Sequence, residues 1–147
     1  MFWKKKKPKI LIVEDDLNNH GLYKDAFESK GFDVVLCQTA DGDFITEVDQ
    51  FKPDLISMDL MIGKNGQAAD RDGFEAMEEL KRDARTKEIP IFVLSNFFQE
   101  KYIQRAKEIG AVDFINAQGQ SLPSVSERYA RYLDNPRRYQ PSQDLFR

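Results

Sequence analysis

Two stretches decide how this chain is interpreted: ILIVEDD at residues 10–16 and DLISMD at residues 54–59. In each, a short apolar run stops at a carboxylate, which is typical of a buried strand that ends at the edge of a sheet. The carboxyl ends of neighbouring parallel strands form the crevice in which open sheets bind ligands. We therefore expect Glu14, Asp15 and Asp59 to converge on one spot.

Three carboxylates at close range repel one another unless a cation lies among them. Carboxylate oxygens are the ligands that hard divalent cations prefer. The sequence therefore predicts a Mg²⁺ site at this edge of the sheet.

Strand-like and helix-like patterns alternate five times, which predicts an α/β fold with a parallel sheet covered on both faces. The expected strands cover 10–13, 33–37, a segment that starts at Pro53, 91–94 and about 112–116. The expected helices start near Asp16, lie within 40–51, start near Gly73, contain 98–109 and cover about 122–133. The predicted apolar stripes are Leu22, Tyr23, Ala26 and Phe27 in the first helix and Phe98, Tyr102, Ala106 and Ile109 in the fourth.

Composition narrows the classes of function. The 147 residues suit one domain, and a net charge of −3 gives no general attraction to nucleic acid. The single cysteine, Cys37, cannot form an internal disulfide, which agrees with a reducing cytoplasm. The apolar run after the lysines at positions 4–7 is too short for an export or membrane segment, so we expect a cytoplasmic protein with no membrane partner.

The chain resembles the response-regulator receiver domains, the family to which CheY belongs. Beside the two stretches above, the matching motifs are LM at 60–61, IPIFVLS at 89–95 and GAVDFI at 110–115, in family order. The resemblance covers residues 9–133 and implies a flavodoxin-like, CheY-like (βα)5 fold, a doubly wound sheet of five parallel strands. Residues 1–8 are then a basic N-terminal extension and residues 134–147 an irregular tail, too short for an effector domain.

The resemblance implies a role for each matched residue. Asp59 is the expected acceptor of a phosphoryl group from a histidine kinase or phosphotransfer protein. Asp15 is expected to bind Mg²⁺ directly, Glu14 to bind it through water, and the backbone carbonyl of Met61 to supply a further oxygen. The hydroxyl of Ser95 is expected to hydrogen-bond the phosphoryl group. Phe114 is the implied switch residue, the aromatic side chain that would move with this hydroxyl, although on the fifth strand it could equally be a fixed core residue.

The largest departure from the family is Ala117, which stands where the family has a lysine. Alanine supplies no charge, so the carboxylates should depend more on Mg²⁺, and the phosphorylated state should lose a charge-assisted contact. The segment 60–72 is also about six residues longer than the usual family loop. Lys64 or Arg71 in this loop could replace the missing cation, although a solvated loop is the simpler expectation.

The sequence leads to one expected function and leaves two others open. We expect a stand-alone receiver, not an enzyme beyond its own phosphorylation and dephosphorylation, which signals through its fourth helix, fifth strand and fifth helix. That face should include Phe97, Phe98, Tyr102, Arg105, Tyr129 and Tyr132. Whether the protein also forms a homodimer is left open. The alternative is a pseudo-receiver, a docking module that Ala117 has freed from phosphorylation.

A hydrolase or flavin protein on the same fold is disfavoured. A phosphatase with an aspartyl nucleophile would need a second acid two residues after Asp59, where this chain has Met61. A flavin site would need a phosphate-binding loop after the first strand, and the acids at 14–16 have the wrong charge for that.

Overall fold

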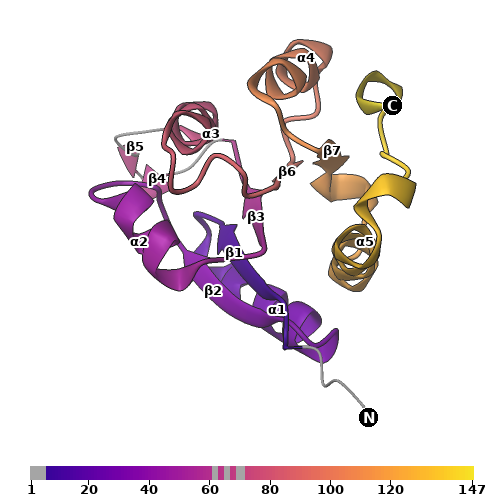
Figure 1. Cartoon of the computed structure of the whole chain (residues 1–147), viewed down its shortest axis with the longest axis horizontal. Coiled ribbons are helices and arrows are strands. Elements are labelled where there is room, and N and C mark those ends of the chain that lie inside the picture. The colour runs from indigo at the N-terminus through magenta and orange to yellow at the C-terminus, as the bar shows by residue number, and fades with distance from the viewer. Residues whose placement is uncertain (1–5, 61–62, 65–66, 69–71) are drawn as a thin grey trace.

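A computed structural model describes residues 6–60 and 72–147 and, between them, the backbone of 63–64 and 67–68. Five parallel strands form one sheet in the order β2-β1-β3-β6-β7 (Figure 1). They are β1 (Lys9–Val13), β2 (Asp33–Cys37), β3 (Leu55–Met58), β6 (Ile91–Ser95) and β7 (Asp113–Asn116). The strand order and the alternation with helices confirm the predicted flavodoxin-like fold.

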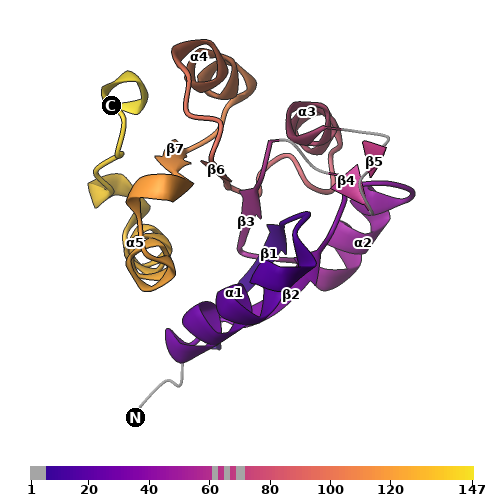
Figure 2. The same cartoon turned by 180° about the vertical axis from the view of Figure 1, so that it is seen from behind.

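Five α-helices cover the two faces of the sheet. They are α1 (Leu17–Ser29), α2 (Phe44–Phe51), α3 (Gly73–Arg82), α4 (Glu100–Ile109) and α5 (Leu122–Asp134). Helices α1 and α5 lie on one face, and α2, α3 and α4 lie on the other (Figures 1 and 2). A buried apolar cluster fills each interface, with Phe27, Phe92 and Tyr129 on the α1/α5 side and Met58, Phe74 and Phe114 on the opposite side.

Three of the helices start with an N-cap residue, whose side chain accepts a hydrogen bond from a backbone N–H group in the first turn. Asp16 caps α1 by accepting from the N–H of Asn18 at 3.0 Å, as the sequence predicts. Asp72 and Glu75 form a reciprocal capping box at the start of α3, and Ser121 caps α5. These caps fix where α1, α3 and α5 leave the carboxyl edge of the sheet.

The structure corrects two details of the predicted helices and one of the predicted signalling face. Leu22 is 62% exposed and does not belong to the buried stripe of α1, which consists of Tyr23 and Phe27. Phe98 precedes α4 instead of lying in it, because its N–H bonds the carbonyl of Asn96 in a turn. Tyr129 is fully buried against Phe27 and Phe92, so it cannot belong to an exposed partner-binding face.

The segment expected as a long loop contains two short strands, β4 (Gly63–Lys64) and β5 (Gln67–Ala68), which pair antiparallel. Met61 and the side chains of Lys64 and Arg71 lie outside the described residues. The predicted metal contact of Met61 and the predicted replacement of the missing lysine therefore stay predictions.

The C-terminal tail wraps around the edge strand β7. After α5, the 3-10 helix η2 (Pro136–Arg138) packs on α5, and the 3-10 helix η3 (Asp144–Phe146) packs on α4. The tail thus passes from one helical layer to the other around the sheet edge (Figures 1 and 2). The hydroxyl of Ser142 contacts the carbonyl of Phe114 on β7, so the tail occupies part of this sheet edge.

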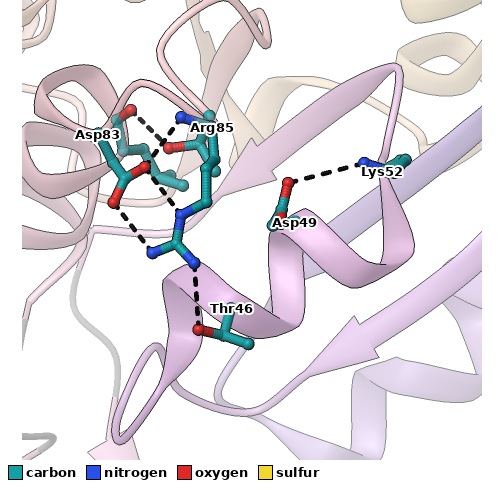
Figure 3. Close-up of polar contacts among 7 residues, drawn as sticks. Thr46, Asp49, Lys52, Asp83 and Arg85 are labelled. Carbon is teal, nitrogen blue, oxygen red and sulfur yellow. Dashed lines mark hydrogen bonds and ion pairs between the residues drawn. The ribbon is translucent and has the colours of Figure 1, made fainter.

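An exposed polar cluster links the turn after α3 to α2 (Figure 3). Arg85 Nε lies 3.1 Å from Asp83 Oδ1, and Arg85 Nη1 donates to the hydroxyl of Thr46 at 3.5 Å. The side-chain hydrogen bond from Arg85, with that of the Arg85 N–H, lowers the pKa of Asp83. Because these groups are solvated, the cluster shapes the turn more than it stabilises the fold.

Among the residues described, no helix combines the length and apolar character needed to cross a bilayer.

Candidate functional site

The parallel register of the central strands brings the predicted carboxylates together. Val13 at the end of β1 pairs with Met58 at the end of β3, and the N–H of Asp59 bonds the carbonyl of Val13 at 3.1 Å. Oxygen atoms of Glu14, Asp15 and Asp59 all lie within 4.8 Å of one another. The convergence expected from the two sequence stretches is therefore present in the structure.

Glu14 is only 7% exposed and is held by three neighbours. Its carboxylate accepts from the N–H of Asp16 at 3.1 Å and from the hydroxyl of Tyr23 at 3.3 Å, and Asn19 also hydrogen-bonds it. Burial nevertheless raises the pKa of Glu14 above its ordinary value. Sequence reasoning placed Tyr23 in the helix core and did not single out Asn19, although their spacing in α1 aims both at the end of β1.

Asp59 has the most perturbed carboxyl of the site. Burial, followed by the charges of Glu14 and Asp15, raises the pKa of Asp59 to about 7. Two donors oppose this shift: the N–H of Leu60, 2.8 Å from Asp59 Oδ1, and the hydroxyl of Ser95. A divalent cation would favour the charged form of all three acids, so the donor set fits Mg²⁺ in chemistry and charge.

A pocket of about 570 Å³ opens above these carboxylates. Its wall includes Ser95 at the end of β6, Asn96 and Phe97 directly after it, and Leu122 and Val125 from α5. Four acids line it: Glu14, Asp15, Asp16 and Asp59. No lysine or arginine lines it in the part of the chain that the structure describes, so its electrostatic character is wholly acidic.

Ala117 contributes to the acidic character of the pocket, because it carries no positive charge. It lines the pocket from the 3-10 turn η1 (Ala117–Gly119), which follows β7 directly. Asn116 caps this turn by accepting from the N–H of Gln118 at 3.0 Å. The position from which the family's lysine would extend is therefore on the pocket wall, occupied by a methyl group.

Gly73 is a site residue that sequence reasoning recognised only as a helix start. Its N–H donates to the carbonyl of Leu60 at 2.8 Å, and a Cβ placed on it would lie 2.7 Å from the Cα of Leu60 and overlap the carbonyl oxygen of Asp59. Only glycine lets α3 approach the acceptor backbone this closely. The sequence signal was available, since a glycine directly after the N-cap of a helix has no role in capping.

Ser95, the residue expected to bond the phosphoryl group, and Phe114, the expected switch residue, are both buried. Ser95 is 1% exposed, and its hydroxyl accepts from the N–H of Phe97 at 3.1 Å. Phe114 is fully buried on β7, with its ring centroid 6.0 Å from that of Phe98. An aromatic contact thus joins β7 to the segment that follows Ser95.

Comparison with known proteins identifies the same family that the motifs suggested. The family model for the response regulator receiver domain matches residues 10–120. The chain is 35% identical over 109 residues to the DNA-binding dual master transcriptional regulator RpaA of Synechocystis, covering 74% of this chain and 42% of RpaA. It is 27% identical over 125 residues to the polar-differentiation response regulator DivK of Brucella anthropi, covering 84% of this chain and 94% of DivK.

Solved receiver structures share the fold. The BeF3-activated receiver domain of Klebsiella pneumoniae RstA aligns with a TM-score of 0.72 at 24% identity, covering 86% of this chain and 98% of that one. A CheY-like receiver domain protein from Methanospirillum hungatei aligns with a TM-score of 0.74 at 19% identity, covering 90% and 98%. The chain spans less than half the length of RpaA and of the Staphylococcus epidermidis response regulator VraR, of which it covers 48%.

Proposed function

The chain belongs to the response regulator receiver domain family of two-component signalling, and from this premise we propose that it accepts a phosphoryl group on Asp59 with Mg²⁺ as cofactor. The observation that carries the proposal is the cluster of Glu14, Asp15 and Asp59 within 4.8 Å at the mouth of an acidic pocket. Three carboxylates with no cation among them are unfavourable, and a phosphoryl donor needs its own negative charge offset as well.

Each described residue has a proposed part in the reaction. Glu14, Asp15 and Asp59 would hold Mg²⁺, with the backbone carbonyl of Met61 as a further ligand by family resemblance. When bound, the cation offsets the charge of the carboxylates and of the incoming phosphoryl oxygens. A carboxylate oxygen of Asp59 forms the new O–P bond as the N–P bond of a phosphohistidine donor breaks. The hydroxyl of Ser95, already directed at Asp59, donates to a phosphoryl oxygen.

Two exposed apolar surfaces beside the acidic pocket support the proposed protein partners. An apolar groove between α1 and α5 contains Leu22, Ala26 and Leu122, and Leu122 also lines the acidic pocket. This groove supports docking of a histidine kinase or phosphotransfer protein beside Asp59. On the opposite side of the site, Phe97 and Phe98 are 42% and 39% exposed, and they support contact with a downstream protein. We place this exchange in the cytoplasm.

The test is intact-mass analysis after incubation with acetyl phosphate, with and without Mg²⁺. We expect one added phosphoryl group on the wild-type chain in Mg²⁺ and none in EDTA. Asp59→Asn should gain none, and Asp15→Asn should gain little because its metal site is weakened. An equal gain in Asp59→Asn would overturn the assignment of the acceptor.

The wholly acidic lining of the pocket favours one second candidate. With Ala117 in place of the lysine, no described basic side chain can stabilise a phosphorylated Asp59. The chain would then be a pseudo-receiver that docks partners without phosphorylation. Absence of labelling together with absence of Mg²⁺ binding by calorimetry would select this function.

A further inference from the structure

A second hollow, which we name the arginine cleft, lies between α5 and the C-terminal tail. Its volume is about 630 Å³. Its wall carries four arginines, Arg128 and Arg131 from α5 and Arg138 and Arg147 from the tail, together with the carboxylate of Asp134. Arg147 also forms an ion pair with Asp144 at 3.4 Å, so the excess positive charge comes mainly from the other three arginines. The lining is strongly basic, although the whole chain carries a net charge of −3.

The tail side of the cleft is anchored through a buried acid on β7. Asp113 is fully buried, and its carboxylate accepts from the hydroxyl of Tyr139 at 2.6 Å and from the N–H and hydroxyl of Ser142 at 2.7 and 3.1 Å. The same hydroxyl lies 3.0 Å from the carbonyl oxygen of Phe114, so its one proton is shared between the two acceptors. A buried carboxylate is costly without donors, so these bonds hold residues 139–142 firmly against the sheet.

The helix side is joined to the tail by Arg128. Its Nη1 donates to the carbonyl of Gln140 at 3.2 Å and to the hydroxyl of Tyr139 at 3.4 Å. Arg131 lies one helical turn further along α5, and Arg138 lies on η2, both exposed to solvent at the cleft. The cleft is thus built by the folded chain before any ligand arrives, with guanidinium groups on both walls.

We propose that the arginine cleft binds a small phosphorylated molecule that carries at least two phosphoryl groups. The planar guanidinium group presents paired donors that match phosphate oxygens, and several such groups on facing walls suit a ligand with more than one phosphate. A volume of about 630 Å³ lies in the range of small-molecule sites and exceeds the size of a single phosphate ion. The enclosing tail makes the site concave, which suits a small ligand better than an extended polyanion.

The arginine cleft adjoins the acidic pocket, since Gln120 lines both, but its arginines do not line that pocket. The test therefore excludes the Mg²⁺-dependent chemistry at Asp59. Calorimetric titrations with inorganic pyrophosphate and with ADP are made in EDTA at low ionic strength, where the acidic pocket repels both ligands. The test variant is the double substitution Arg131→Gln with Arg138→Gln, which removes one charge from each wall. The matched control is Arg137→Gln with Arg82→Gln, which removes the same charge from exposed positions outside the cleft.

We expect saturable binding of one pyrophosphate per chain, weakened about tenfold or more in the test variant and less than about threefold in the control. Tighter binding of ADP than of pyrophosphate would identify a nucleotide ligand, and equal binding would identify the diphosphate group as the whole determinant; both support the site. Absence of saturable binding, or equal weakening in both variants, would overturn the proposal. Thermal unfolding of both variants without ligand verifies that the fold is intact.

Discussion

At the scale of single residues, the close contact between Gly73 and the backbone of Asp59 and Leu60 makes a sharp prediction. Gly73→Ala should displace the acceptor strand end or α3, lowering the free energy of unfolding by about 1–3 kcal/mol and slowing phosphorylation by acetyl phosphate. Urea denaturation and intact-mass time courses measure the two effects.

Gly21→Ala is the matched control. Gly21 lies inside α1 with nothing within 4 Å of an added Cβ, so alanine should stabilise the protein by about 0.5–1 kcal/mol through helix propensity. Equal stability changes for both substitutions would show that the contact at Gly73 does not matter.

Ala117 permits a gain-of-charge prediction. Ala117→Lys should place an ammonium group in the acidic pocket, lower the pKa of Asp59 and raise the free energy of unfolding in EDTA near neutral pH. Gln118→Lys, at the exposed neighbouring position, adds the same charge outside the pocket. Urea denaturation measures the free energy of unfolding of both variants. An equal increase in both would mean that stability depends on the net charge of the protein and not on a charge inside the pocket.

The raised pKa of Asp59 predicts a pH dependence of stability in the absence of metal. Its ordinary value is 3.8 and its folded value is about 7, so between these values the folded state holds a proton that the unfolded state has lost. This contribution to stability is complete below the unfolded pKa and is lost as the pH rises through the folded pKa.

Asparagine resembles the protonated acid, so Asp59→Asn should match the wild type near about pH 4 and become the more stable protein by about pH 8. Urea denaturation in EDTA at several pH values measures the difference between the two proteins. A difference that does not change with pH would contradict the assigned shift.

At the scale of elements, the packing of the C-terminal tail is the feature that the composition of the sequence predicts least well. Its two prolines and its lack of apolar period predict an irregular segment. Apart from the three-residue turns η2 and η3 the tail carries no regular element, yet it packs against α4, α5 and β7, which composition does not indicate. The physical reason lies in β7: Asp113 is buried, and its donors come from residues 26 and 29 positions later. No local pattern can reveal a hydrogen bond of that sequence separation.

Ser142→Ala should therefore lower the free energy of unfolding by about 1–2 kcal/mol, because Asp113 loses a buried donor. Ser124→Ala, whose hydroxyl bonds Gln120 on the exposed surface, should change it far less. Hydrogen exchange adds a local measurement: amides of β7 should exchange faster in Ser142→Ala. Unchanged protection of β7 would contradict the anchoring role of the tail.

Helix positions, by contrast, follow closely from sequence. Asp16 and Gly73 mark the starts of α1 and α3 to within one residue, since caps and close approaches are local requirements. The sequence predicts Phe98 inside α4, and the difference also has a local cause. Phe98 lies in a turn after β6, and the spacing of apolar residues does not reveal this turn. The apolar character of Leu22 predicts a core position, but this face of α1 is exposed to solvent.

At the scale of the whole molecule, the sheet order explains why the central site could be predicted. Two apolar runs that end in acids must bring those acids together once the runs are parallel neighbours, as β1 and β3 are. The arginine cleft could not be predicted in this way, because its walls come from α5 and from a tail whose path depends on Asp113. The contacts between the ends of β1 and β3 follow from the hydrophobic pattern of the sequence. The contacts of the tail around the edge strand β7 do not.

The central claim, that Asp59 accepts the phosphoryl group in this acidic pocket although Ala117 replaces the family's lysine, is tested most directly by locating the modification. The protein is phosphorylated with acetyl phosphate and Mg²⁺, reduced with sodium borohydride, which converts an aspartyl phosphate to homoserine, and sequenced as peptides by mass spectrometry. We expect homoserine at position 59, dependent on Mg²⁺. Homoserine at another aspartate, or at none, would contradict the account.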